Sequence, residues 1–230
     1  GAHIHEDSQV AGLDYENGVW RLRTGQGGQV TAPRLLMATN AYHRAPDGGA
    51  LPRLAHLTFF QLATEPLPER LVADILPGGE GAWDTGTIMT SFRRDAAGRL
   101  ILGAMGRAEG LGRGLHHAWA RGKLSRLFPG LADVRFAHAW TGRIAVTGDH
   151  IPKIAELGRG GLAIFGYSGR GIAPGTVLGR RAAVALLEGR EETLPIAPLR
   201  EYIDPAPGLR TLIYEAGALA RHGLGRMTGL

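Results

Sequence analysis

The sequence predicts a mixed α/β (α+β) fold, and two observations lead to this prediction. Short apolar or alternating segments bounded by glycine and proline, which are typical of strands, outnumber the segments with helical periodicity. Late in the chain, an apolar strand at residues 161–165 is followed directly by a glycine-rich turn and then by a helix. No internal repeat interrupts this pattern.

The composition is that of a globular protein. Of the 230 residues, 44% are hydrophobic and 20% are charged, and 36 glycines with 13 prolines indicate many tight turns. The net charge of +5 is spread over scattered arginines, so no nucleic-acid partner is predicted. No stretch approaches the roughly 18–20 apolar residues of a membrane span. The absence of cysteine excludes disulfides, cysteine-ligated metals and thiol nucleophiles, and it is compatible with the cytoplasmic location that we expect.

The first part of the chain is predicted to form strands. Alternating apolar and polar residues predict a half-buried strand at residues 19–24, and an apolar run predicts a buried strand at residues 33–39. Residues 3–10 are interpreted as a further strand. Residues 46–52 run from Pro46 to Pro52 with glycines between them, and they predict the first boundary of the chain.

Beyond this boundary, the sequence predicts a long strand at residues 54–64 and a hairpin formed by residues 87–94 and 99–103. A helix is predicted at residues 116–128, with Leu127 on its inner face, and proline and glycine end it. The remaining predicted elements are strands at residues 134–140 and 161–165 and helices at residues 172–187 and 212–220.

The glycine-rich turn at residues 166–171 is the most informative segment. Such a turn presents backbone N–H groups and a helix N-terminus to an electron-rich ligand group. The helix that follows is expected to be broken early by Pro174 and Gly175. The alternative is a plain strand-to-helix connection whose glycines only permit positive φ, and the turn alone leaves both interpretations open.

Further segments accompany this turn in a fixed order. They are Ala38-Thr39-Asn40-Ala41-Tyr42, Trp83-Asp84-Thr85 with residues 99–103, Trp140-Thr141-Gly142 leading to residues 147–154, and the turn Gly166-Tyr167-Ser168-Gly169-Arg170-Gly171 itself. Together they resemble the motifs of the D-amino-acid oxidase/glycine oxidase superfamily of FAD-dependent oxidoreductases. Within it, the pattern is most similar to gamma-glutamylputrescine oxidoreductase-like proteins.

The resemblance implies an enzyme that binds FAD and oxidises a C–N bond of an amine or amino acid. Hydride would pass from carbon to the flavin, and water would hydrolyse the resulting imine. By similarity, the flavin ring would be lined by Gly166, Tyr167, Ser168, Gly169, Arg170, Gly171 and Ile172. Ala38, Thr39, Asn40 and Gly142 would also lie near the cofactor, Val10 would lie on its adenine side, and Tyr42 and Trp140 could wall the substrate site. No catalytic residue and no metal site are assigned.

Three features depart from the pattern of the superfamily. No Gly-x-Gly-x-x-Gly follows a first strand, so we expect a missing N-terminal segment or a partner chain to hold the ADP half of FAD. Arg170 stands where relatives often carry histidine, and it is either a fixed positive charge beside the flavin or a surface arginine. Ile144 lies where amino-acid oxidases use an arginine for the substrate carboxylate, which favours an amine as the small-molecule substrate.

The resemblance also implies how the chain is divided. An incomplete FAD-binding (glutathione-reductase-like) domain, at residues 1–45 and 141–200, would be interleaved with an antiparallel-sheet substrate-binding domain at residues 46–140, and residues 201–230 would form a C-terminal tail. An incomplete flavin sheet would expose an edge, so self-association is expected. The alternative is a non-catalytic subunit that keeps the oxidase fold and needs another chain to bind flavin.

Overall fold

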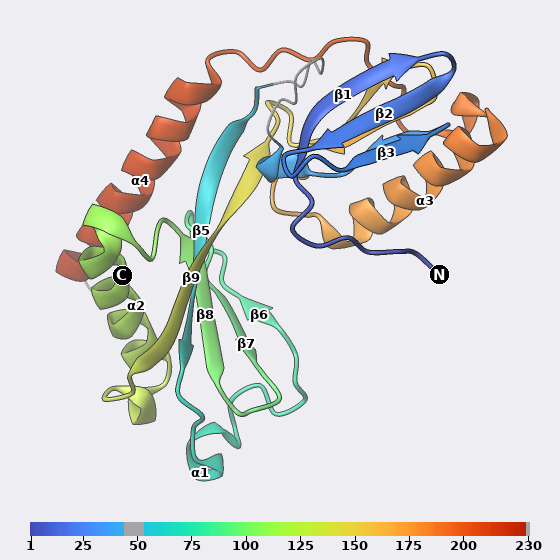
Figure 1. Ribbon diagram of the computed structural model, residues 1–230. Helices are drawn as coiled ribbons and strands as arrows, with labels where there is room; N and C mark the ends of the chain where they lie inside the picture. The colour runs from blue at the N-terminus through green and yellow to red at the C-terminus, as the bar shows by residue number, and fades with distance from the viewer. Residues whose placement is uncertain (44–52, 229–230) are drawn as a thin grey trace. The chain divides into compact units, whose positions relative to one another are not determined.

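The structure of the protein is a computed structural model that describes residues 1–43 and 53–228 (Figure 1). The chain forms two compact units: unit 1 is Gly1–Ala55 with Ala145–Pro207, and unit 2 is His56–Ile144 with Gly208–Leu230. The chain therefore passes between units after residues 55, 144 and 207, where the sequence predicted divisions after residues 45, 140 and 200. The predicted boundary segment from Pro46 to Pro52 lies outside the described residues.

Unit 1 begins with an antiparallel sheet in the order β1 (Val10–Glu16), β2 (Val19–Thr24) and β3 (Gln29–Ala32). The strand predicted at residues 19–24 is confirmed as β2. The strand predicted at residues 3–10 is wrong, because Val10 pairs with Thr24 at the end of β2 and no further residue of β2 remains for residues 3–9 to pair with.

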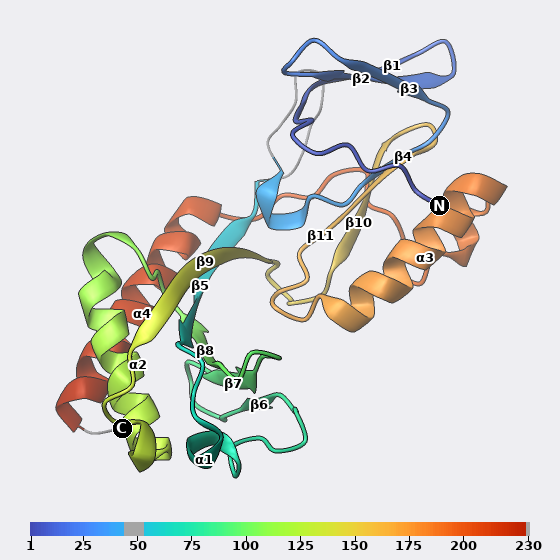
Figure 2. The same ribbon diagram turned by 60° about the horizontal axis from the view of Figure 1, so that its bottom comes forward.

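A second sheet of unit 1 has the order β10 (Lys153–Gly158), β11 (Gly161–Phe165) and β4 (Leu35–Met37). β10 and β11 are antiparallel, whereas β11 and β4 are parallel. The predicted strand at residues 161–165 is confirmed as β11, all of whose residues are buried. Figure 2 shows α3 (Ile172–Glu188) running along this sheet.

The helix α3 packs by an apolar stripe and is continuous. The residues of this contact are Leu178, Ala182 and Leu186 on the helix and Ile154, Leu162 and Ile164 on the sheet. The predicted break at Pro174 and Gly175 is wrong. Pro174 lies in the first turn, where a backbone N–H has no intrahelical acceptor, so its missing donor leaves the helix intact. The helix ends at Gly189 in the left-handed conformation, with φ of 67°.

Trp20 joins the two sheets of unit 1. Its side chain is buried, and the indole Nε1 donates a hydrogen bond to the carbonyl of Arg159 at 3.2 Å. The ring lies against Gly161, where an added Cβ would be 2.3 Å from Cζ2 of Trp20. Because Gly161 has no side chain, the indole of Trp20 can occupy the space at the start of β11.

Unit 2 is built on a sheet with the strand order β6-β7-β8-β5-β9 (Figure 1). The predicted hairpin is confirmed, and its turn is closed by the carboxylate of Asp95, which accepts hydrogen bonds from the backbone N–H groups of Ala97 and Arg99. The strands are β5 (Ala55–Thr64), β6 (Ala82–Trp83), β7 (Ser91–Arg94), β8 (Leu100–Met105) and β9 (Phe136–Val146).

Two long helices lie on the same side of this sheet in both views (Figures 1 and 2). The helices of unit 2 are α1 (Glu69–Val72), α2 (Arg113–Leu127) and α4 (Pro207–Thr228). Trp119 of α2 packs against Phe60, Leu62 and Leu102 of the sheet. None of the helices among residues 1–43 and 53–228 combines the length and the apolar character that a bilayer crossing requires.

The inner face of α2 differs from the prediction at its two ends. Leu127, which was predicted to be buried, is 46% exposed, because the helix ends there and Phe128 packs against Leu124 and Leu131 instead. At the other end, His116 is buried although it is a polar residue. Its burial depends on a partner in α4.

Candidate functional site

A cavity of about 490 Å³ opens in unit 1. Its wall is made by residues 8–10, by residues 35–39, by Leu13 and Leu22, and by Tyr42 with His43. The aliphatic side chains form most of the wall, and the hydroxyl and imidazole groups are few. An apolar cavity with a small number of polar groups is typical of a site that holds an organic ligand or cofactor.

The cavity gathers several residues that the sequence analysis singled out. Val10, Ala38, Thr39 and Tyr42 all line it. Ala38 and Thr39 follow β4 directly, whereas Val10 begins β1. The structure therefore brings the predicted adenine-side residue, two predicted cofactor residues and one predicted substrate residue to the same cavity.

The remaining predicted residues of unit 1 meet at one edge of the second sheet. β4 and β11 are parallel, and Leu35, Leu36 and Met37 pair with Gly161, Leu162 and Ala163. Their carboxyl ends therefore point the same way, so the segment at residues 38–40 and the turn at residues 166–171 follow adjacent strand ends. In open α/β sheets, ligands bind outside the carboxyl ends of parallel strands.

A hydrogen bond joins these two segments. The backbone N–H of Gly166 donates to Oδ1 of Asn40 at 2.9 Å. Both residues have positive φ, 46° for Asn40 and 80° for Gly166, and Ser168 has φ of 51°. Left-handed conformations of residues other than glycine are uncommon, and they gather at functional sites where the surrounding structure holds them in place.

The turn leads into a helix end that is open to solvent. Gly171 provides no capping side chain at the start of α3, and Ile172 is 91% exposed. Because the first N–H groups of an α-helix have no carbonyl partner within the helix, this end favours an electron-rich group. Arg170 is also exposed beside it. In contrast, Tyr167 packs its side chain into the core of β11 and α3, and this burial raises the pKa of its hydroxyl.

The loop before β10 supports the turn from the other side. Thr147 is buried, its hydroxyl donates to the carbonyl of Ile151 at 2.9 Å, and its backbone N–H donates to the hydroxyl of Ser168 at 3.3 Å. Asp149 forms an ion pair with Lys153 at 2.5 Å. The hydrogen bond from Lys153, together with the N–H of Ile151, lowers the pKa of the Asp149 carboxyl.

Two predicted site residues belong to the other unit. Trp140 and Gly142 lie on β9 within unit 2, and Trp140 is 40% exposed. Conversely, the sequence analysis missed Ser8 and His43, which line the cavity of unit 1. Both flank predicted residues in the chain, but only the fold shows that they face the same space. In the described residues, no group of three or more potential metal ligands comes together.

Comparison with known proteins relates this arrangement to a family. The family described as "FAD dependent oxidoreductase" (DAO) matches residues 1–185 of the chain. A probable oxidoreductase OrdL of Rhizobium meliloti (strain 1021) is 30% identical over 172 residues, which are 75% of this chain and 40% of that protein. Gamma-glutamylputrescine oxidoreductase of Escherichia coli (strain K12) is 28% identical over 218 residues, which are 92% of this chain and 49% of that protein. This chain thus spans less than half of the length of these two curated relatives.

Solved structures show the same fold. Glycine oxidase from Geobacillus kaustophilus aligns with a TM-score of 0.61 at 19% identity, over 88% of this chain and 54% of that one. Fructosyl amine: oxygen oxidoreductase (Amadoriase I) from Aspergillus fumigatus aligns with a TM-score of 0.60 at 18% identity, over 78% of this chain and 45% of that one. The mixed α/β fold and the resemblance that the motifs carry are both confirmed.

Proposed function

Since this chain belongs to the DAO family of FAD-dependent oxidoreductases, we propose that the complete protein uses FAD to oxidise a C–N bond of an amine or amino acid, and that an amine is favoured. The observation that carries this proposal is the hydrogen bond from Gly166 to Asn40, which ties two predicted cofactor segments together at the carboxyl edge of β4 and β11. The names of three relatives, which refer to gamma-glutamylputrescine, glycine and fructosyl amine, support the substrate class.

The residues present fit a flavin at this edge. Gly166 leaves no room for a side chain, because an added Cβ would be 2.4 Å from Cγ2 of Thr147. Beyond the turn, the open end of α3 offers N–H groups to an electron-rich oxygen. We propose that the backbone of residues 166–172 binds the flavin ring, and that Ala38, Thr39 and Val10 lie beside the cofactor. When bound, FAD would accept the electron pair that leaves the C–N bond.

The other residues of the site would exclude water and fix orientation. The aliphatic wall formed by Leu13, Leu22 and Met37 lowers the local polarity of the cavity. Tyr42 is 61% exposed and lines the cavity, so its ring would contribute to the wall of the substrate site. The fixed charge of Arg170 would stabilise negative charge that develops on a ligand at the turn. Trp140 and Gly142 lie in unit 2, and their role stays a prediction from the resemblance.

The ADP half of FAD requires a further element. These 230 residues contain no Gly-x-Gly-x-x-Gly after a strand, and they correspond to 40–49% of the curated relatives. We therefore assign the pyrophosphate and ribose contacts to residues outside this sequence, in the same protein or in a partner chain. The same observation favours one alternative function, a subunit that keeps the fold without catalysing the reaction.

The experiment is a comparison of flavin content and amine-dependent bleaching of the flavin band in the complete protein and two variants. Gly169 and Gly189 are both exposed and have φ of 86° and 67°, so Gly169→Leu and Gly189→Leu strain the backbone alike. We expect Gly169→Leu to abolish flavin retention and Gly189→Leu to preserve it. Full flavin content and turnover in Gly169→Leu would refute the placement of the cofactor. A complete protein that is colourless after reconstitution with FAD would support the non-catalytic alternative.

A further inference from the structure

One cavity of unit 2 is lined by none of the residues assigned to the flavin. It has a volume of about 270 Å³ and opens between the loop at residues 84–90, α2 and α4. Three separate elements therefore contribute polar side chains to one small space. The residues of its wall that matter here are Asp84, Thr90, Trp119, Lys123, Arg221 and His222.

Two polar atoms on this wall are buried without a hydrogen-bond partner. Thr90 and His222 are both 0% exposed. The hydroxyl oxygen Oγ1 of Thr90 and the ring nitrogen Nε2 of His222 have no hydrogen-bond partner among the described residues. Buried polar atoms in proteins are nearly always paired. Two unpaired atoms on the wall of one cavity therefore indicate that a ligand or water completes both.

A series of contacts connects these two residues around the cavity. The ring of His222 stacks on that of Trp119, with the centroids 3.8 Å apart and the planes at 16°. One turn further along α2, Nζ of Lys123 lies 2.8 Å from Oδ2 of Asp84. Oδ1 of Asp84 accepts a hydrogen bond from the backbone N–H of Thr90 at 2.9 Å. Every residue of this series lines the cavity, so packed and paired groups fix the shape of its wall.

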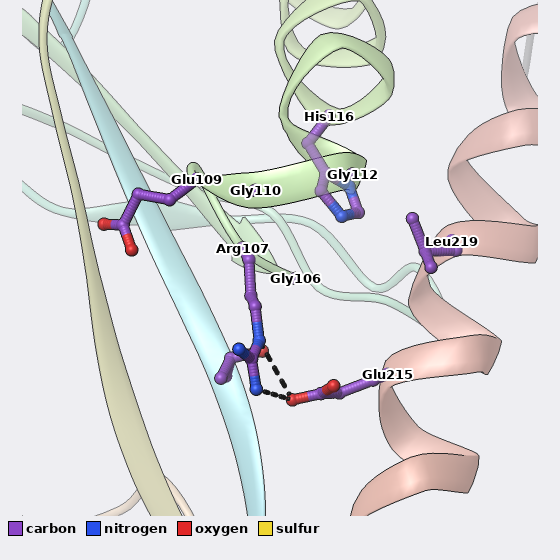
Figure 3. A pocket seen from close by; sticks show the side chains of 9 residues that line it. Gly106, Arg107, Glu109, Gly110, Gly112, His116, Glu215 and Leu219 are labelled. Carbon is purple, nitrogen blue, oxygen red and sulfur yellow. Dashed lines mark hydrogen bonds and ion pairs between the residues drawn. The ribbon is translucent and has the colours of Figure 1, made fainter.

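The histidine that pairs with His222 lines a different cavity. Nδ1 of His116 lies 2.7 Å from Nδ1 of His222, and His116 lines a cavity of about 330 Å³ (Figure 3). In that cavity, Figure 3 shows Arg107 bonded to Glu215, while Glu109 points away from both. Arg107 and Glu215 therefore neutralise each other beside His116.

The histidine pair determines what His222 can offer to a ligand. Burial lowers the pKa of both rings, His222 to about 3, so both are neutral near neutral pH. One Nδ1–H must then donate to the lone pair of the other Nδ1. When His116 is the donor, the proton of His222 is on Nε2, and this Nε2–H is the unpaired group at the cavity.

One positive charge at the cavity of His222 has no counter-ion. Asp84 uses both carboxylate oxygens within the wall, Oδ2 for Lys123 and Oδ1 for backbone N–H groups of its own loop. Burial works against the charged carboxylate, but these bonds outweigh it and lower the pKa of Asp84. Arg221 forms no ion pair within the part of the chain that the structure describes. Because Asp84 and Lys123 balance each other, the charged side chains that line the cavity leave one net positive charge.

We propose that this cavity binds a small aliphatic monocarboxylate, whose oxygens accept hydrogen bonds from Nε2–H of His222 and from the hydroxyl of Thr90, with Arg221 as the counter-charge. An ionised carboxylate only accepts hydrogen bonds, so it matches two donors beside a net positive charge. Trp119 and Ile88 line the same cavity and would contact the aliphatic part. An ammonium ligand would be repelled by Arg221. A neutral amide would satisfy the donors but leave this charge uncompensated.

The test uses the complete protein and sodium butyrate as the probe in isothermal titration calorimetry near neutral pH. Butyramide is the matched control for the charge, n-butylammonium chloride for its sign, and inorganic phosphate for the aliphatic part. We expect saturable binding of butyrate that is stronger than that of each control. Equal binding of butyramide or of phosphate would overturn the proposal. No saturable binding of butyrate would also overturn it and would leave water as the occupant.

Variants locate the binding within the protein. Thr90→Val and Arg221→Gln should each weaken butyrate binding about tenfold, which corresponds to the loss of about 1.4 kcal/mol from one hydrogen bond or ion pair of a charged group. Thr90→Val should fold like the wild type, because it replaces a hydroxyl that has no partner in the free protein.

Two further variants are the matched controls. Thr58 is also buried with an unpaired Oγ1, but it lines the cavity of Figure 3, so Thr58→Val should leave the affinity for butyrate unchanged. Arg70 is exposed and does not line the cavity of His222, so Arg70→Gln should also leave it unchanged. Unchanged affinity in Thr90→Val, or an equal loss in Thr58→Val, would contradict the assignment.

Nitrogen-15 spectra of labelled histidine give a readout that a loss of folding does not mimic. Butyrate should fix His222 with a protonated Nε2, while its Nδ1 accepts the proton of His116. An unprotonated Nε2 of His222 in the bound state would exclude the proposed contact. Because calorimetry and these spectra do not depend on flavin turnover, failure of this proposal and failure of the proposed function remain distinguishable.

Discussion

The side-chain oxygen of Asn40 accepts a hydrogen bond from the backbone N–H of Gly166 at 2.9 Å, across a separation of 126 residues. Asn40 follows β4 and Gly166 follows β11, so the bond ties the ends of two adjacent parallel strands. It replaces the ladder hydrogen bond that both segments lose where they leave the sheet. The bond therefore fixes the two segments relative to each other at the edge where we place the flavin ring.

Replacement of Asn40 by alanine should lower the free energy of unfolding by about 2 kcal/mol. About 1 kcal/mol comes from the hydrogen bond that leaves the Gly166 N–H unpaired, and about 1 kcal/mol from alanine at a positive φ. Asn17→Ala is the control, because Asn17 has φ of 51° in an exposed turn and carries only the backbone cost. Urea unfolding measures both. Equal destabilisation would show that the Asn40 bond contributes nothing.

Gly166→Ala should destabilise the protein by about 2 kcal/mol or more, since it combines a positive φ with a steric clash. The clash is with Cγ2 of Thr147, 2.4 Å from the position of the new Cβ. Thr147→Ser removes that methyl group and keeps the hydroxyl that bonds to Ile151. In a double-mutant cycle, Gly166→Ala should therefore be less destabilising in the Thr147→Ser background. Additive effects would contradict the contact.

Much of the fold could be predicted from local pattern. The bounds of β11 follow from an uninterrupted apolar run with a glycine at its start and another directly after its end, because both faces of this strand are buried. The helix α4 was predicted only at residues 212–220, whereas it spans Pro207–Thr228. Its glycines lower the helix propensity that a local pattern can detect, and the burial of Ala218 and His222 against the rest of unit 2 compensates for them.

The candidate site could be predicted in part, because its segments contain residues that are typical of turns directly after an apolar strand. That residues 38–40 and 166–171 meet depends on parallel pairing between strands far apart in the sequence, and no local signal contains that pairing. The pair of His116 and His222 could not be predicted for the same reason, since 106 residues separate them. The Asn17-Gly18 turn, in contrast, is a hairpin signal that the sequence analysis overlooked when it placed a strand too early.

Gly161→Ala should lower the free energy of unfolding by about 2 kcal/mol, because the new methyl group must displace a buried indole. The Cβ would lie 2.3 Å from the ring of Trp20, and displacement also breaks the bond from Nε1 to the Arg159 carbonyl. Urea unfolding followed by tryptophan fluorescence measures the loss of stability and a red shift of the native emission. Gly25→Ala, in an exposed turn with open space around the new Cβ, is the control and should change neither.

The buried histidine pair should make unit 2 less stable in mild acid. Burial lowers the pKa of His222 from 6.5 to about 3 and also lowers that of His116, so below pH 6.5 the unfolded chain binds more protons than the folded chain. The contribution of the pair is then constant above this pH. For His222, stability falls as the pH decreases toward 3, by up to about 1.4 kcal/mol per pH unit, and His116 acts in the same direction. Asp84 acts in a lower window. Burial opposes its ionisation, but hydrogen bonds from Lys123 and from the backbone outweigh this and lower its pKa below 3.8.

Urea midpoints measured from pH 7.5 to 4.5, a window chosen to span roughly the histidine range, should therefore report the protonation of the histidine pair. His222→Gln should flatten the slope of stability against pH. Should that variant not fold, nuclear magnetic resonance titration of the wild type decides the matter, because a His222 ring that protonates near pH 6.5 would contradict the prediction.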